Sequence, residues 1–343
     1  MSFELSDEER SLQQLVAQFA ADEFGGQRAQ SGPTEWKAQW DHMTDLGLTT
    51  ILVPEAHGGS GGTLVDACLI AEELARADAW VPFAGGAVLG VMALRSSDSA
   101  AALRALAEAA GGALFSLVTD SQLQLSDSPG EVGFDWREGA IPVALTGTYA
   151  RPLESAGTTA DGSSDPFHPL GRLRHAEPLP PPFWTQAQRQ VRVAGWVALS
   201  AWLNGLAGAA LRDAVDFAKQ RHQFGVPIGS FQAVQHLCAD MLVDVESSRS
   251  VTLGAAWFAA NADLVRAERL AAAAKAWSSS AAVRVCETSI QVHGGIGITW
   301  EHIAHRRLRT ALQFSRALGG ATDMHAVLAD QGEEIVVKAH GSH

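Results

Sequence analysis

The segment Lys219–Met241 reads Lys-Gln-Arg-His-Gln-Phe-Gly-Val-Pro-Ile-Gly-Ser-Phe-Gln-Ala-Val-Gln-His-Leu-Cys-Ala-Asp-Met, and this pattern predicts two helices joined by a tight corner. Gly225 and Pro227 end the first helix, and Ser230 is a suitable N-cap for the second. The second helix carries an apolar stripe at helical spacing, which comprises Phe231, Val234, Leu237 or Cys238, Met241 and Val245. We therefore expect a helical hairpin.

Arg221 lies at this corner, with Gln232 and Gln235 nearby. A guanidinium can bind a pyrophosphate through two parallel hydrogen bonds, which a lysine cannot do as well. On these residues alone, an ordinary hairpin with a solvated arginine remains open as the alternative.

A second segment, Gln291-Val-His-Gly-Gly-Ile-Gly297, follows a long Ala-rich helix. Its glycines remove side chains where an extended ligand could contact the backbone, although a plain helix end also favours glycine. The two segments begin 70 residues apart, at Arg221 and Gln291, and as a pair they resemble the acyl-CoA dehydrogenase family. The resemblance implies that they belong to a C-terminal four-helix domain and reach across a dimer interface to the ADP end of the neighbouring subunit's FAD. The cofactor-binding residues it implies are Arg221, Phe224, Gln232, Gln291, Gly294 and Gly295.

Composition limits the function and the compartment. The net charge is −13, so we do not expect the chain to bind nucleic acid or an anionic membrane through bulk electrostatics. Three scattered cysteines in apolar contexts, Cys68, Cys238 and Cys286, predict core thiols in a reducing compartment. The N-terminus lacks a signal-peptide pattern, and no apolar run is long enough for a membrane span. We expect a soluble cytoplasmic protein.

The chain divides into three expected domains. Residues 1–111 are helical, with a capping box at Ser6 and a helix over about Thr63 to Arg76, and they resemble the family's N-terminal domain. Residues 112–185 contain two predicted strands, Ala113–Thr119 and Ile141–Tyr149, and a turn-rich stretch from Ser155 to Pro182. Residues 186–343 are Ala-rich and helical again. The fold class is therefore mostly α with a small β-domain between two helical domains.

The middle domain is shorter than in typical members of the family. Those members carry a Thr-Glu-Pro segment and a Trp segment around the flavin ring. Here Thr119-Asp120-Ser121 stands in the first place, and the second has no convincing counterpart. The resemblance therefore implies that this subunit's own flavin site is eroded; diverged loops that still bind are the alternative.

The family's catalytic carboxylate is absent from both of its known positions. Matching the glycine loops places the first position near Leu318-Gly319-Gly320, and no Asp or Glu occurs between Glu301 and Asp323. The second position precedes the arginine corner, where no carboxylate occurs from Glu177 to Asp213. Asp323 is expected at a helix start, and Asp213 and Asp216 are expected in solvent. The arginines of the next helix, Arg306, Arg307 and Arg309, are expected on a solvated or inter-subunit face.

These features resemble the shortened subunit of bacterial α2β2 acyl-CoA dehydrogenases, in which a longer partner carries the base; several of those enzymes act on steroid side-chain CoA esters. The resemblance implies an accessory subunit without catalytic residues or metal ligands of its own. It would complete the FAD site of a Glu-bearing partner that binds the acyl-CoA.

Two other functions remain open. The chain could be a self-sufficient flavoenzyme, either a monooxygenase or a dehydrogenase in which His222, His236 or His293 replaces the carboxylate. It could also be a scaffold subunit that binds a partner but no flavin.

Overall fold

A computed structural model describes residues 4–25, 36–125, 131–146, 149–153, 157–159, 165–173, 186–261 and 264–340. The turn-rich stretch predicted from Ser155 to Pro182 lies mostly outside these residues. The N-terminal helices are α1 (Asp7–Phe24), α2 (Trp36–Asp45), α3 (Leu64–Arg76), α4 (Val91–Arg95) and α5 (Ala100–Ala110), with a 3-10 turn η2 (Glu55–His57) and a π-helical segment η3 (Phe83–Gly90).

Local capping explains where two of these helices begin. Ser6 accepts a hydrogen bond from the Glu9 N–H, and the Glu9 carboxylate accepts one from the Ser6 N–H, which confirms the predicted capping box. Thr63 and Asp66 make the same reciprocal pair at the start of α3.

The middle region holds one six-stranded sheet in the order β4-β3-β1-β2-β6-β5. Only β1 and β3 pair in parallel, with Phe115 opposite Ile141. The strands are β1 (Phe115–Thr119), β2 (Val132–Gly133), β3 (Ile141–Thr146), β4 (Tyr149–Pro152), β5 (Gly157–Thr159) and β6 (Gly171–Leu173). The prediction of a single strand over Ile141–Tyr149 is wrong, because Tyr149 begins a second strand that pairs antiparallel with the first.

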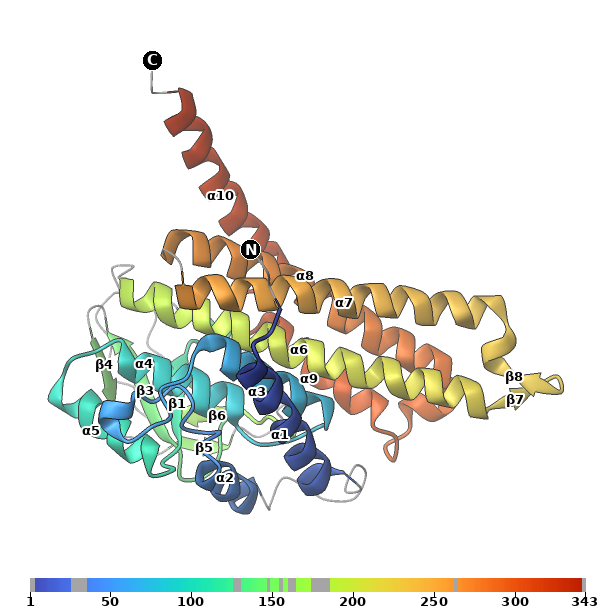
Figure 1. Ribbon diagram of the computed structural model, residues 1–343, viewed down its shortest axis with the longest axis horizontal. Helices are drawn as coiled ribbons and strands as arrows, with labels where there is room; N and C mark the ends of the chain where they lie inside the picture. Colours follow the sequence, from blue (N-terminus) through green and yellow to red (C-terminus); the bar gives the residue numbers. More distant parts are fainter. Residues whose placement is uncertain are drawn as a thin grey trace.

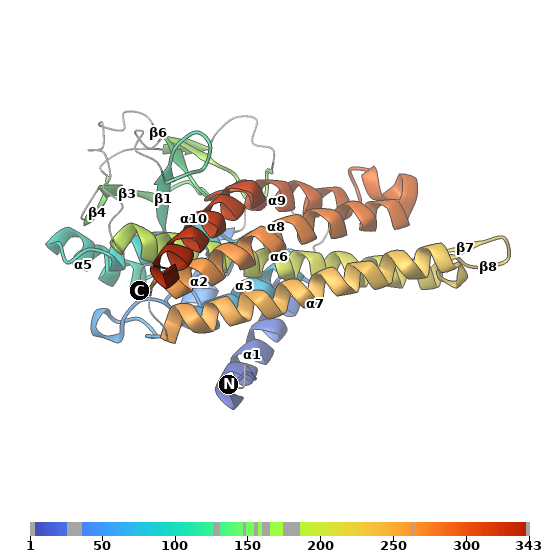
Figure 2. The same ribbon diagram turned by 90° about the horizontal axis from the view of Figure 1, so that it is seen from above.

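The C-terminal region consists of long helices: α6 (Gln186–Gln220), α7 (Gln232–Asn261), α8 (Leu264–His293), α9 (Ala304–Arg316) and α10 (Ala321–His340). The short elements between them are β7 (His222–Gln223), β8 (Val226–Pro227), η4 (Ile228–Ser230) and η5 (Gly294–Ile298). The sheet lies at one end of the bundle and the β7–β8 hairpin at the other (Figure 1, Figure 2).

Helix α6 is the core of the molecule, in contact with α3, α7, α8 and α9. It is apolar on nearly every side, as expected of a helix surrounded by protein. By length and hydropathy its segment Gln188–Gln220 would also suit a membrane, but its most apolar window is entirely buried inside the protein. At Gly205 a Cβ atom would lie 2.1 Å from the Glu72 carbonyl oxygen, so glycine is required where α3 crosses α6.

Ion pairs join the N-terminal helices to the bundle. Buried Glu72 of α3 accepts hydrogen bonds from Arg249 of α7, at 2.8 Å and 3.1 Å, and also pairs with Arg76. Burial raises the pKa of Glu72, against the lowering effect of the two arginines.

Candidate functional site

The corner predicted from Lys219–Met241 is a two-residue β-hairpin at the far end of the bundle. Helix α6 ends at Gln220, and Gln223 pairs with Val226 across the turn. Phe224 and Gly225 both have positive φ, 53° and 83°, as in a type I′ turn. Positive φ is unusual for a phenylalanine, and this side chain is 92% exposed. The hairpin therefore holds an aromatic ring in solvent at a backbone position that would suit asparagine better.

The N-cap prediction for Ser230 is wrong. Ser230 ends the 3-10 turn η4, and the extended residue before helix α7 is Phe231. The Gln235 side chain instead donates a hydrogen bond of 2.9 Å to the Gly229 carbonyl, which ties the helix to the turn. Exposed Phe231 meets Phe224 edge to face at 6.2 Å.

The glycine loop follows α8 directly. Gly294 has φ 62°, in the left-handed region, and begins the 3-10 segment η5. A Cβ atom on Gly294 or Gly295 would meet nothing within 4 Å, so the backbone of both residues faces open space. By contrast, Gly297 is buried and packs against the Ile290 carbonyl, on the side of the loop that faces the protein. Two of the three glycines thus leave backbone accessible to another molecule.

The two predicted segments meet in space. One open depression at the hairpin end of the bundle is lined by residues of both, including Arg221 from the corner and Gly295 from the glycine loop; its other lining residues are Phe217, Gln223, Ile228, Val292, His293, Ile296 and Thr299. Gly294 adjoins it. Phe224, Gln232 and Gln291 are exposed at the same end but do not line it.

This depression suits the phosphate end of a dinucleotide. Arg221 is exposed and offers a planar array of N–H donors, and the bare backbone at Gly295 permits close approach. These residues fit the ADP half of FAD. The binding roles of all six residues remain predictions.

The polar groups of Thr119 and Asp120, in the segment expected near the flavin ring, form hydrogen bonds within the protein. The Thr119 hydroxyl donates to the Val132 carbonyl at 3.1 Å, and the Asp120 carboxylate accepts from the N–H groups of Gln122 and Gln124. The Gln124 side chain in turn donates to the Arg316 carbonyl. Among the described residues, this segment has few polar groups left to offer a flavin ring.

Leu318 belongs to the segment Leu318-Gly319-Gly320, near which the first position of a catalytic base is expected, and it is buried. Its N–H donates to the Leu123 carbonyl at 2.8 Å, and its carbonyl accepts from the Trp196 indole at 2.7 Å. Asp323 lies in the first turn of α10 and accepts a hydrogen bond from the Gly320 N–H, so the prediction of a helix-start residue is confirmed. The Asp323 carboxylate thus lies beside Gly319 and Gly320, while the Leu318 side chain offers no acid or base group.

The histidines considered as replacement bases lie elsewhere. His222 and His236 are exposed at the hairpin end of the bundle. His293 is buried, and its Nδ1 lies 2.7 Å from the Ser289 carbonyl oxygen, which makes Nδ1 the protonated nitrogen. Its ring packs against Phe217 and His302, with centroids 4.6 Å and 4.5 Å away.

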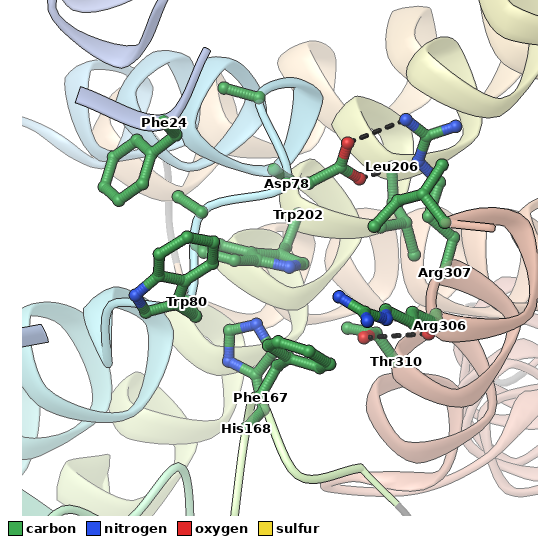
Figure 3. A pocket seen from close by; sticks show the side chains of 14 residues that line it. Phe24, Asp78, Trp80, Phe167, His168, Trp202, Leu206, Arg306, Arg307 and Thr310 are labelled. Carbon is green, nitrogen blue, oxygen red and sulfur yellow. Dashed lines mark hydrogen bonds and ion pairs between the residues drawn. The ribbon is translucent and has the colours of Figure 1, made fainter. Parts of the chain in front are cut away.

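Aromatic side chains fill the junction of the three regions. Trp202 of α6 and Phe314 of α9 both pack edge to face against His168, at 5.1 Å and 5.0 Å, while Trp80 contacts Phe167 at 6.3 Å. Figure 3 shows Trp80, Trp202, Phe167 and His168 converging on a narrow space beside Arg306. The space left is about 30 Å³. A cavity needs roughly 10–15 Å³ of such space to hold one water molecule, so only about two would fit, whereas ligand pockets span roughly 300–1,000 Å³.

A buried polar network supports this aromatic cluster, and sequence reasoning missed it. His168 lies 3.0 Å from the Asp135 carboxylate, and its carbonyl accepts from the Gln313 amide at 2.6 Å. Asp165 accepts from the Thr310 hydroxyl at 2.6 Å. These partners lie 33 to 145 residues apart, and Asp135, Asp165 and His168 lie outside regular helices and strands, so no spacing pattern could have revealed them.

Three further expectations are corrected. Arg307 is not on a solvated face: its side chain is 1% exposed and binds Asp78 at 2.6 Å and 2.7 Å and Asp213 at 2.8 Å. Asp213 is accordingly partly buried, with its side chain 23% exposed, and pairs with Arg307 rather than standing free in solvent. Burial alone would lower the pKa of Arg307, but the two carboxylates raise it.

Cys238 is only partly buried, unlike Cys68 and Cys286.

Comparison with known proteins agrees with this architecture. The acyl-CoA dehydrogenase N-terminal domain family model matches residues 6–113, and the C-terminal domain model matches residues 184–331. Acyl-CoA dehydrogenase FadE34 of Mycobacterium tuberculosis is 33% identical over an alignment 343 positions long, which covers 92% of this chain. The matched region is 47% of FadE34, so the chain spans about half the length of that relative.

Two other similarities also cover most of this chain. Acyl-CoA dehydrogenase IpdE2 of M. tuberculosis is 33% identical over 280 residues, covering 80% of this chain and 78% of IpdE2. The solved structure of a Tcur3481-Tcur3483 steroid ACAD variant superposes with a TM-score of 0.83 at 25% identity, covering 96% of this chain and 99% of the other. The family and its structural neighbours are FAD-binding flavoproteins. With both terminal domains matched, this chain belongs to the acyl-CoA dehydrogenase family.

Proposed function

We propose that this chain is the non-catalytic subunit of a FAD-dependent acyl-CoA dehydrogenase, a cytoplasmic α2β2 complex with a longer partner that carries the catalytic Glu. Arg221 and the backbone at Gly294 and Gly295 contact the ADP half of FAD seated mainly in that partner. Phe224, Gln232 and Gln291 complete this contact. FAD supplies the hydride acceptor for α,β-dehydrogenation of the acyl-CoA bound by the partner, and this chain contributes to holding the cofactor.

One contrast supports the proposal above all others. Among the described residues, the junction where the three regions meet leaves only about 30 Å³ of free space, and Leu318, near the position where the resemblance implies a carboxylate, is buried. At the hairpin end of the bundle, Arg221 is exposed and the glycine backbone is open. A chain without room for a ligand at this junction, but with an exposed arginine and open glycine backbone at the hairpin end, is suited to contribute contacts to a FAD site in another subunit.

Exposed apolar side chains at the same end favour a protein partner there. Ile296, Ile298 and Trp300 of the glycine loop are 47%, 70% and 61% exposed, and Phe224 adds a further ring. Apolar surface clustered in this way is typical of interfaces, because its burial is favourable. The same contact would bring Arg221 to the partner's cofactor.

The class of substrate is inferred from relatives. The similar solved structure is described as a steroid ACAD and its name joins two chains, which supports a paired assembly and a CoA ester of a steroid side chain as substrate. The acyl group would lie in the partner, so this chain's residues do not define its length.

The test is co-expression with a Glu-bearing partner, followed by FAD content and acyl-CoA oxidation. Arg221→Ala is expected to lower FAD content at fixed free FAD and to weaken FAD binding at least tenfold, the loss expected of one charge-assisted hydrogen-bonded contact. Lys219→Ala is the matched control, since Lys219 is an exposed cation two residues earlier that does not line the depression.

Each alternative function predicts a different result. A scaffold subunit would form the complex with unchanged FAD content in Arg221→Ala. A self-sufficient flavoenzyme would retain about one FAD per isolated chain and would oxidise an acyl-CoA, or hydroxylate with oxygen, without a partner. The proposal requires the isolated chain to be nearly free of flavin.

A further inference from the structure

Two imidazole rings join the ends of the glycine loop. His293 is the last residue of α8 and His302 lies two residues before α9, so residues 294–301 form a loop whose ends approach each other. The ring centroids of His293 and His302 are 4.5 Å apart. His293 also packs on Phe217 of α6, one helical turn before Arg221, and it lines the same depression. His293 therefore contacts both the far end of the glycine loop, at His302, and the helix turn that precedes Arg221, at Phe217.

His302 is held in its neutral form by a specific hydrogen bond. Its Nδ1 accepts from the Ala304 N–H at 3.2 Å, an arrangement that requires an unprotonated Nδ1. This contact satisfies one of the N–H groups at the start of α9, as the side chain of an Asn does in an Asx turn. A proton on Nδ1 would remove the acceptor and place a positive charge at the positive end of the helix dipole.

The charges around His302 oppose its protonation on balance. His293 faces it from α8, and Arg307 and His305 face it from α9; Asp213 of α6 is the one opposing carboxylate, and it is already paired with Arg307. Burial, followed by His293 and Arg307, lowers the pKa of His302 from its ordinary value of 6.5. Because the neutral form is favoured only in the closed loop, the loop's stability is complete above pH 6.5 and declines as the pH falls below it.

We propose that His302 is a proton-sensitive latch that keeps the glycine loop in its cofactor-binding shape and releases it on acidification. The consequence for FAD rests on the function proposed above: the complex would lose its hold on the ADP half in acid. Simple electrostatics predicts the reverse, since an added positive charge beside a pyrophosphate would strengthen binding. The sign of the pH effect therefore separates the latch from a plain charge effect.

The first experiment uses the isolated full chain, so it does not depend on FAD or on a partner. Amide hydrogen exchange of residues 294–303, corrected for its intrinsic pH dependence, is compared at pH 7.5 and 5.5. Loop opening is expected to increase by up to about tenfold, the ratio set by one proton taken up by the open loop with an ordinary pKa near 6.5. His302→Asn keeps an acceptor for the Ala304 N–H but cannot titrate, so its exchange should not change with pH.

His236→Asn is the matched control, because His236 is exposed at the same end of the bundle and should leave the wild-type pH response intact. A pH-independent loop in the wild-type chain, or an unchanged acid response in His302→Asn, would overturn the latch. The second experiment measures FAD retained by the partner complex at both pH values. Loss of FAD in acid that disappears in His302→Asn supports the proposal, whereas retention that stays constant or rises while the loop loosens refutes its link to the cofactor.

Discussion

At the scale of single residues, a buried lysine joins helix α8 to the end of α9. Lys275 of α8 is entirely buried, and its Nζ lies 2.8–3.2 Å from four acceptors, which are the carbonyls of Phe314, Ser315 and Gly319 and the Ser279 hydroxyl. These carbonyls lie at the end of α9, where the helix has unpaired acceptors and a partial negative charge. Lys275 therefore connects α8 to the C-terminal end of α9 and to the segment around Leu318.

This lysine predicts a measurable pH dependence of stability. Burial lowers the pKa of Lys275 to about 7, against the raising effect of Asp323. Between pH 7 and the ordinary value of 10.5, the unfolded chain holds a proton that the folded chain has released, so the free energy of unfolding rises with pH. Lys275→Met should lose this increment, at most about 1.4 kcal/mol per pH unit.

Urea denaturation at pH 7, 8 and 9 tests this prediction. Lys219→Met removes an exposed lysine and should keep the wild-type pH profile. Parallel profiles for wild type and Lys275→Met would mean that Lys275 keeps its proton in the folded state.

At the scale of elements, the turn of the β7–β8 hairpin carries an exposed aromatic residue at a backbone position that disfavours it. Its first turn residue is Phe224 at φ 53°, where Asn followed by Gly would be the favoured pair. An exposed aromatic ring in a strained position contributes little to the isolated chain's stability. Its presence is better explained by contact with another molecule.

Phe224→Asn tests this explanation. The variant should be as stable as wild type or up to about 1 kcal/mol more stable, since the strain is relieved. It should also weaken FAD retention in the partner complex about tenfold, as expected when one aromatic contact is lost from an interface. Thermal unfolding and FAD titration measure the two effects. A variant that is less stable and binds FAD normally would contradict the assignment of Phe224 to the site.

At the scale of the whole molecule, the aromatic junction and the hairpin end have separate roles. The junction lies about halfway along α6, where Trp202 packs beside residues of all three regions, and the open depression lies at the hairpin end. We expect the junction to stabilise the fold, and we propose that a partner binds at the hairpin end. A substitution in the junction should therefore change folding without changing the complex's chemistry.

Trp202→Ala is the corresponding test. Removing this 1%-exposed side chain should cost about 3–5 kcal/mol of stability through the cavity it leaves. The turnover per folded complex should stay near that of wild type, because the acyl group lies in the partner. Trp277→Ala, at 44% exposure, should cost less than about 1 kcal/mol. A large change in KM for the acyl-CoA in Trp202→Ala would instead locate a substrate site in this chain.

The sequence by itself determined the fold class, the capping box at Ser6 and the positions of the two glycine-containing segments along the chain, because glycines, caps and helical periodicity act over a few residues. The sequence also shows that no Asp or Glu occurs between Glu301 and Asp323, since the absence of a residue type can be read without geometry. Only the tertiary structure decided that Arg307 is buried between Asp78 and Asp213, that His168 meets Asp135, and that Trp202 helps to fill the junction. These contacts join residues distant in the chain, and burial changes an arginine or a histidine from a solvated group into a structural one.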